Sequence, residues 1–275
     1  MTEWLTLVLT GVAGVGAGSL GAMLGLGGAI VLVPLLNLGL GLPLMQTKAI
    51  SLITVIATSN AVALSRTGRR TANVRLAMLL QLVAALGALV GLRILTLTNV
   101  RTQEQIFGGT ALLVAAVMIA RLDFRNILDP SVTDVGVLGG RVEDPDTGRE
   151  VAYRVRRVPF ALGVTFAAGI ISSLAGVGGG ILVVPALNSW CGVPMRVAAA
   201  TSAVILGITA LPGVIGYYKL GYLTMPELAA VAVLGVLAGS RLGFWISSRV
   251  KVRSLKILMA VILAIVAFEY LYLKD

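Results

Sequence analysis

Leu174-Ala175-Gly176-Val177-Gly178-Gly179-Gly180-Ile181-Leu182-Val183-Val184-Pro185-Ala186-Leu187-Asn188 is the stretch of sequence that decides the fold. A near-copy lies upstream, as Met23-Leu24-Gly25-Leu26-Gly27-Gly28-Ala29-Ile30-Val31-Leu32-Val33-Pro34-Leu35-Leu36-Asn37. A constant offset of 151 residues relates the two copies, and the same offset carries Pro43 onto Pro194. The chain therefore contains an internal duplication, and the duplicated unit is apolar with a glycine-rich break inside it.

The composition is that of a membrane protein. Of the 275 residues 57% are hydrophobic and only 12% are charged, and mean hydropathy is +0.97, whereas soluble domains are about half apolar and a quarter charged. The first residues, Met1 to Trp4, lack the basic segment of a removable signal, so we expect the first helix to be retained. The net charge of +10 lies in loops, where it sets orientation rather than binding nucleic acid.

Several classes of chemistry have no residues to use. Histidine is absent and Cys191 is the single cysteine, which removes the commonest metal ligand, a disulfide and the base of a serine or cysteine triad. We therefore expect neither an enzyme nor a metal site nor a cofactor.

Long apolar blocks follow one another along the chain. They span 4–37, 42–64, 76–97, 105–121, 158–188, 196–218, 226–247 and 255–273. The loops at 65–75 and 248–256 carry four basic residues each and no acidic residue, so we expect both loops in the cytoplasm. Counting spans from these loops makes block 158–188 begin and end on the same side of the membrane, which a single helix cannot do.

The sequence therefore predicts an all-α polytopic membrane protein with two inverted repeats. Each repeat begins with a glycine-broken helical hairpin, whose arms of ~15 residues reach ~22 Å, and continues with three spanning helices. We expect a first membrane repeat at 1–121, a cytoplasmic linker at 122–157 and a second repeat at 158–275. Inverted repeats with broken helices are typical of transporters that bind substrate near the midplane. Eight full spans with parallel halves stay open as the alternative.

The linker predicts a small β-hairpin. Alternating residues at 135–142 and 151–157 flank the turn-forming cluster Asp144-Pro145-Asp146-Thr147-Gly148. An isolated hairpin is only marginally stable, so we expect this one to lie against the membrane domain.

The glycine runs are the first candidate binding residues. Unwound backbone is tolerated within a membrane only where it is buried in protein or lines a wet cavity, and N–H groups at the start of a helix suit an anion. Close helix packing is the competing interpretation. The candidates are Gly25, Gly27 and Gly28 in the first run, and Gly176, Gly178, Gly179 and Gly180 in the second. A dinucleotide loop is excluded because no acidic residue follows at the required distance.

Matched polar residues are the second set of candidates. Asn37 and Asn188 follow the prolines by three residues and could either bind the substrate or cap a helix. The hydroxyl pairs Ser51 with Thr58 and Ser202 with Thr209 are each seven residues apart, which places each pair on one helix face. These hydroxyls could complete the binding shell or bond to their own backbone.

Charged residues within spans are the third set. Arg93 and Arg241 both follow a glycine by two residues and could act as anion ligands or gates, or could extend to the membrane surface. Lys48 starts a helix and is expected at the interface. All twelve acidic residues lie in loops or near the ends of spans, so a midplane carboxylate relay or sodium site is not predicted.

At these motifs the sequence resembles the TauE/SafE sulfite exporter family, also called the TSUP family of membrane anion permeases. The resemblance rests on the paired G-x-G-G-[GA]-x-x-x-x-P blocks, the four apolar blocks per half and the duplication. The first copy has Ala29 where the second has Gly180. The resemblance implies transport of a small sulfur-containing anion, such as sulfite, sulfoacetate or a related organosulfonate.

The sequence is therefore interpreted as a secondary transporter that exports such an anion across a prokaryotic inner membrane by alternating access between the repeats. A passive anion channel and a non-transporting membrane scaffold remain the alternatives. The expected partners are the small anion and the lipid bilayer, and no oligomeric state is predicted.

Overall fold

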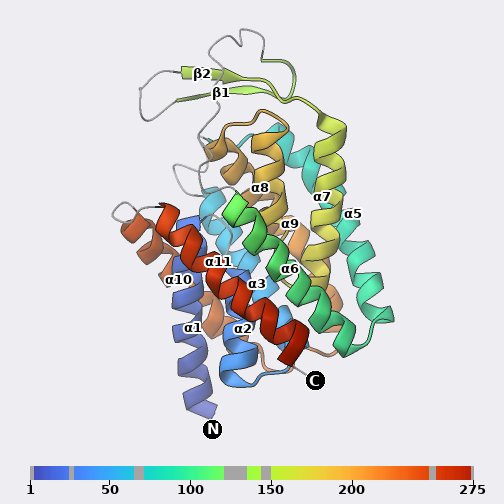
Figure 1. Cartoon of the computed structure of the whole chain (residues 1–275), viewed down its shortest axis with the longest axis vertical. Coiled ribbons are helices and arrows are strands. Elements are labelled where there is room, and N and C mark those ends of the chain that lie inside the picture. Colours follow the sequence, from blue (N-terminus) through green and yellow to red (C-terminus); the bar gives the residue numbers. More distant parts are fainter. Residues whose placement is uncertain are drawn as a thin grey trace.

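The structure is a computed structural model and describes residues 3–24, 28–64, 71–120, 135–143, 150–247 and 252–273. It is a helical bundle with a two-stranded sheet at one end (Figure 1). In the first half the elements are α1 (Glu3–Leu24), α2 (Ala29–Pro34), η1 (Leu35–Gly39), α3 (Leu44–Leu64), α5 (Val74–Leu97) and α6 (Val100–Ala120). Then follow β1 (Gly140–Glu143), β2 (Glu150–Tyr153), α7 (Val158–Ala175), α8 (Gly180–Ser189), α9 (Met195–Lys219), α10 (Pro226–Ser247), α11 (Val252–Phe268) and η2 (Glu269–Leu273).

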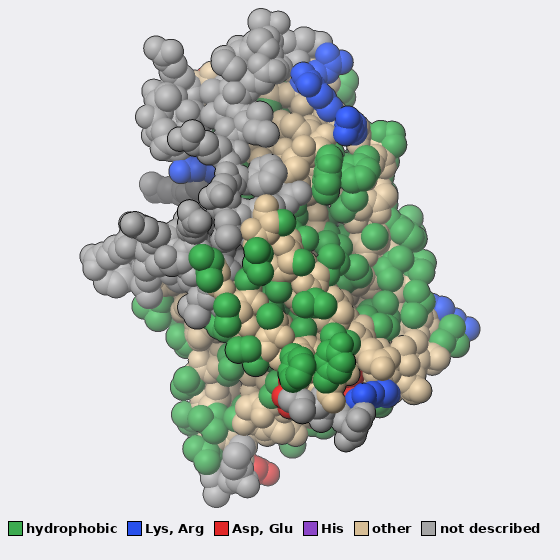
Figure 2. Space-filling model, in the orientation of Figure 1, with side chains coloured by type: hydrophobic (Ala, Val, Ile, Leu, Met, Phe, Trp, Pro, Cys, Tyr) green, Lys and Arg blue, Asp and Glu red, His purple; other side chains and the backbone are tan. Residues whose placement is uncertain are grey.

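Five helices within the described residues are long and apolar enough to cross a membrane: the main parts of α1, α5, α7, α9 and α10. Figure 2 shows hydrophobic side chains over the middle of the visible face and charged side chains toward its upper and lower ends. Large apolar side chains are exposed on these helices, for example Leu82 at 67% and Leu234 at 69%. Such a surface is stable in lipid and would aggregate in water, so the chain is a multi-pass membrane protein.

Each glycine-rich block folds back on itself. In the first half Gly28 has a φ of 72°, and a Cβ added to it would lie 2.6 Å from the carbonyl oxygen of Ala17 on α1. In the second half a Cβ on Gly179 would lie 2.8 Å from the carbonyl oxygen of Ala168 on α7. Each contact therefore joins a glycine to a residue eleven positions earlier, and the two contacts are related by the offset of 151.

The arms of these hairpins are unequal, which the sequence did not predict. α1 has 22 residues, whereas α2 has six and continues into the five-residue π-helical turn η1. In the second half α7 has 18 residues and α8 has ten. The return arms are short because Asn37 and Asn188 end them, as described below.

The two halves are interleaved. The most extensive helix pairs each take one helix from each half: α1 with α10, α5 with α7, α3 with α9, α5 with α9 and α6 with α11. Both chain termini lie at the lower end in Figure 1, and the sheet lies at the upper end. In the same view α1 begins at the lower end and α7 begins at the upper end, beside the sheet.

Glycines bring the crossed pairs into backbone contact. Cβ atoms added to Gly87 and Gly91 of α5 would collide with the carbonyl oxygens of Phe166 and Ile170 on α7. Gly239 and Gly243 of α10 face the carbonyl oxygens of Val15 and Ser19 on α1 in the same manner. Small residues allow helices in lipid to approach this closely.

The predicted linker hairpin is present. β1 and β2 pair antiparallel, with Gly140 opposite Tyr153 and Glu143 opposite Glu150. Asn73 caps α5 by accepting from the Leu76 N–H at 3.0 Å, and its amide donates to the carbonyl oxygen of Leu138 and to the Tyr153 hydroxyl at 2.7 and 3.0 Å. The hairpin therefore lies against the start of α5.

Candidate functional site

The second break, residues 176–179 between α7 and α8, lies at the centre of the bundle. Gly176 and Gly178 have φ angles of 71° and 69°, which only glycine adopts without strain. A Cβ on Gly178 would lie 3.2 Å from Leu206 of α9 and 3.4 Å from Val55 of α3. The break therefore lies against the crossing of α3 and α9, which is also where the two halves meet.

The backbone of this break has unused donors. The Gly176 N–H donates to the carbonyl oxygen of Ser172 at 2.9 Å, and the Leu182 N–H donates to that of Gly179 at 3.2 Å. Between them, the N–H groups of residues 177–180 make no hydrogen bond within the described part of the chain. Because these groups are at the start of a helix, they carry its positive dipole end. Buried donors without acceptors are rare and call for a partner.

A serine hydroxyl without a partner lies beside these donors. Ser202 of α9 is 1% exposed, and its Oγ makes no hydrogen bond to any described residue. A Cβ on Gly180 would lie 3.0 Å from that oxygen. Its counterpart Ser51 donates to the carbonyl oxygen of Ala29 at 3.2 Å. The second half therefore has an open hydroxyl where the first half has a satisfied one.

The other predicted polar residues hold backbone in place. Asn37 donates to the carbonyl oxygen of Leu42 at 2.6 Å, and Asn188 donates to that of Val193 at 3.0 Å. Thr58 and Thr209 donate to the carbonyl oxygens of Thr54 and Ile205, four residues earlier, at 2.9 and 2.8 Å. Of the two interpretations left open for the asparagines and hydroxyls, this geometry favours backbone bonding at these four residues.

The position of Lys48 differs from the prediction, which placed this residue at the membrane interface. Its side chain is 0% exposed, which places it among the largest fully buried side chains that the structure describes, and its Nζ has no hydrogen-bond partner among the same residues. A Cβ on Gly176 would lie 2.7 Å from the Cβ and 2.9 Å from the Cγ of Lys48. The aliphatic stem of the lysine therefore packs against the glycine that begins the second break.

Further buried polar atoms lie close to the same glycine. Ser172 and Ser173, within one turn of Gly176 on α7, are buried, and neither hydroxyl has a partner in the part of the chain that the structure describes. The carboxylate of Glu104, 9% exposed near the start of α6, acts electrostatically on Lys48. The site thus combines a cation, hydroxyls and backbone N–H groups, which are the donors that bind an oxyanion.

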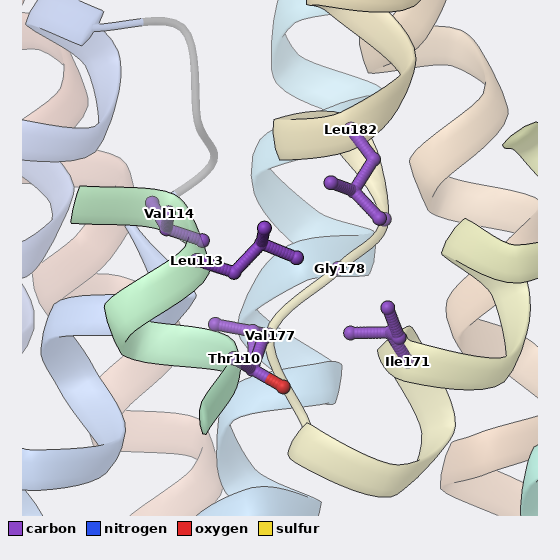
Figure 3. Close-up of a pocket in the computed structure, with 8 residues that line it drawn as sticks. Thr110, Leu113, Val114, Ile171, Val177, Gly178 and Leu182 are labelled. Carbon is purple, nitrogen blue, oxygen red and sulfur yellow. The ribbon is translucent and has the colours of Figure 1, made fainter. Parts of the chain in front are cut away.

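A pocket opens on the side of the break that faces α6 (Figure 3). In the close-up, Thr110, Leu113 and Val114 come from α6, and Ile171 and Leu182 face them from the arms of the second hairpin. The lining is completed by Val177, Gly178 and Gly179. Thr110 is the one polar side chain among these residues, and its hydroxyl donates to the carbonyl oxygen of Ile106. The pocket therefore suits an apolar group.

The remaining predicted residues lie apart from these donors. Gly25 and Gly27 lie outside the described residues, and Gly28 packs against α1. Arg93 and Arg241 are exposed, unlike the buried residues of the breaks. The packing also shows that the two arginines are not equivalent in the repeat. Gly239 contacts α1 in the way that Gly87 contacts α7, and this alignment places Trp245, not Arg241, at the position that matches Arg93.

Sequence reasoning missed Lys48, Ser172 and Ser173 as candidate site residues. One signal could have identified Lys48: it is a lysine within an apolar block, and the offset of 151 places Ala199 at its counterpart. Among the described residues, no cluster of three or more Cys, Asp or Glu side chains could hold a metal ion.

Comparison with known proteins gives the family. A family model described as sulfite exporter TauE/SafE matches residues 10–270. The chain is 25% identical over 276 aligned residues to the probable membrane transporter protein YunE of Bacillus subtilis (strain 168), with 98% of each chain covered. It is 29% identical over 106 residues to the probable membrane transporter protein MJ0441 of Methanocaldococcus jannaschii, covering 35% of this chain and 39% of the relative. No solved structure matches it significantly. With almost its whole length matched, this chain belongs to the TauE/SafE sulfite exporter family of membrane transporters.

Proposed function

We propose that the protein is a secondary carrier that exports a small sulfur-containing anion, sulfite or an organosulfonate such as sulfoacetate, across a prokaryotic cell membrane. The family supports a small anion as the substrate. The membrane potential supports export, since it contributes about 2.3 kcal/mol per charge per 100 mV.

The observation that carries the proposal is the row of N–H groups at residues 177–180 that have no acceptor within the described residues, with the open Ser202 hydroxyl beside them. We place the anion there, with its oxygens accepting from these donors. The apolar pocket lined by α6 lies next to the break, and it would have to widen to hold the carbon part of an organosulfonate. Gly176, Gly178, Gly179 and Gly180 serve by keeping side chains away from the donors.

The transport cycle we propose is alternating access by inverted repeats. The opposite starting ends of α1 and α7 in Figure 1 support the inversion, and both re-entrant hairpins then reach the middle of the membrane. The glycine-to-carbonyl contacts join α1 to α10 and α5 to α7. The moving bodies are therefore these crossed pairs, which shift around the α3 and α9 core, and not the two sequence halves.

The decisive variant is Gly180→Ala. The added Cβ would lie 3.0 Å from Ser202 Oγ and 2.9 Å from a methyl group of Leu206, which crowds the donors. Alanine is compatible with the fold here because the matched residue of the first half is Ala29. We expect normal folding and a loss of about 10-fold in anion affinity, equivalent to one charged hydrogen bond. Sulfite-dependent thermal stabilisation and uptake into inside-out vesicles measure it.

Serine variants provide the matched control. Ser202→Ala should weaken sulfite binding and leave the melting temperature unchanged, because its hydroxyl has no protein partner. Ser51→Ala should lower the melting temperature and leave binding unchanged, because its hydroxyl bonds to Ala29. Equal effects of the two variants would contradict the site. Sulfite flux in wild-type vesicles that does not saturate with sulfite concentration would indicate a channel and not a carrier. The absence of any flux would favour a scaffold.

A further inference from the structure

The burial of Lys48 costs free energy that a bound ligand could offset. A buried ammonium without a partner is among the costliest arrangements in a protein, more so within a membrane domain. Nζ of Lys48 has no hydrogen-bond partner within the described residues, and the side chain is fully buried. An ammonium at this position is costly in the substrate-free protein, and a bound anion would offset that cost.

The position of Lys48 connects it to the second break. Its Cα, Cβ and Cγ all lie within 2.9 Å of the place where a Cβ on Gly176 would be. An alanine at 176 would therefore expel the lysine stem, and glycine is required both for this contact and for the φ of 71°. The lysine belongs to α3 of the first half, whereas the break that it contacts belongs to the second half.

The first break has no equivalent of this arrangement. At the offset of 151 the counterpart of Lys48 is Ala199, that of Gly180 is Ala29, and that of the open Ser202 is the satisfied Ser51. All three differences point in the same direction: among the described residues, which omit 25–27, the lysine, the space and the free hydroxyl accompany the second break.

A carboxylate, that of Glu104, lies within electrostatic range of Lys48. It acts on Lys48 through space without accepting a hydrogen bond from Nζ, and it has other contacts of its own. An anion at the break would thus meet a lysine that is partly compensated at a distance but has all its N–H donors available. Glu104 competes electrostatically with the anion for the same cation.

We propose that Lys48 is the counter-ion of the transported oxyanion and that the protein binds one such anion per chain, at the second break only. This inference rests on the proposed anion site and adds the residue that supplies its charge and the stoichiometry. Lys48 and Glu104 make opposite contributions: the lysine attracts the anion, and the carboxylate weakens its binding.

The test uses the purified full-length chain in detergent, with sulfite as the probe under anaerobic conditions. Calorimetric titration of the wild type should give one sulfite per chain. Lys48→Met should lose at least about 10-fold in sulfite affinity and should raise the melting temperature of the sulfite-free protein, because an unpaired buried charge is removed. Glu104→Gln should tighten sulfite binding by roughly 3-fold. Lys219→Met, at the exposed end of α9, controls for the change in net charge.

The outcomes separate this inference from the proposed function. If Lys48→Met binds sulfite as tightly as the wild type while Gly180→Ala does not, the site stands and the role of Lys48 is wrong. If Lys48→Met and Glu104→Gln both lower the melting temperature without changing affinity, the two residues are a structural ion pair and the inference fails. Two sulfites per chain would overturn the single site, and no binding of sulfite or an organosulfonate to the wild type would overturn the proposed function itself.

Discussion

Asn37 and Asn188 make the same hydrogen bond in the two halves, each to a carbonyl oxygen five residues later. Both side chains are buried, at 7% and 4% exposure. The bond ends the short return arm of the hairpin and turns the chain toward the next helix. This geometry makes the asparagines part of the framework that holds the break.

Asn188→Ala should therefore affect stability and not binding. The change leaves the carbonyl oxygen of Val193 without this donor, at a cost of about 1–3 kcal/mol. We expect a melting temperature several degrees lower and an unchanged affinity for sulfite, measured by thermal unfolding and calorimetric titration. Asn60→Ala, at an exposed position of α3, should change neither quantity. A loss of sulfite affinity in Asn188→Ala without a loss of stability would indicate that the Asn188 amide binds the substrate.

The contrast between Ser51 and Ser202 indicates how far sequence predicts single residues. The two serines are equivalent in the repeat, and the sequence correctly pairs them. What it could not predict is that one hydroxyl bonds to Ala29 and the other is open. This depends on how closely α2 and α8 approach α3 and α9, which the local sequence does not determine. Lys48 was assigned to the interface for a similar reason, since its burial depends on the packing of α7.

At the scale of elements, α1 and α10 approach each other at backbone distance. Gly18 of α1 faces the carbonyl oxygen of Val236, and Gly14 faces that of Ala232, where a Cβ would lie 2.9 Å away. No side chain fits between the two helices at these points. Their relative position is thus determined by backbone contact over several turns.

Two glycines on α1 offer a matched test of this contact. Gly18→Ala would push its Cβ into the Val236 backbone and should destabilise the protein by about 1–3 kcal/mol or more, as overpacking does. Gly16→Ala meets nothing within 4 Å and should be neutral or slightly stabilising, because alanine is the better helix former. The melting temperatures of the purified variants measure the difference. Equal melting temperatures would contradict the proposed rigidity of the pair.

The elements themselves were largely predictable. Apolar periodicity and the glycine runs indicated the helices, and the turn cluster indicated the β1–β2 hairpin. The predicted lengths of the arms of the first hairpin were wrong, because α1 continues to Leu24 along its glycine contacts with α10. Contacts between distant helices extend a helix beyond what its local sequence requires.

At the scale of the whole molecule, the orientation of the halves has a direct test. Gly39 and Trp190 are related by the offset of 151, and both are exposed at the end of a return arm. In a Cys191→Ser background, Gly39→Cys and Trp190→Cys each present a single thiol. With inverted repeats, a membrane-impermeant maleimide should label the first in intact cells and the second only after permeabilisation. Labelling of both from one side would favour parallel halves.

The pairing of helices across the halves could not be predicted. The offset of 151 identifies equivalent helices, but equivalence does not say which helices touch. The partners are chosen by small residues on two different helices, such as Gly91 on α5 and the chain around Ile170 on α7. The number of basic residues in each loop predicts which side of the membrane that loop faces, but it does not predict which helices pack together.

The interleaving of the halves has a consequence for the history of the gene. A single copy of the unit would present the faces that α1, α3, α5 and α6 now bury against the other half, with nothing to cover them. Such a polypeptide would need a second copy of itself to cover these faces. The two copies in this chain differ in sequence, and Ala199 stands at the repeat position that Lys48 occupies in the first copy.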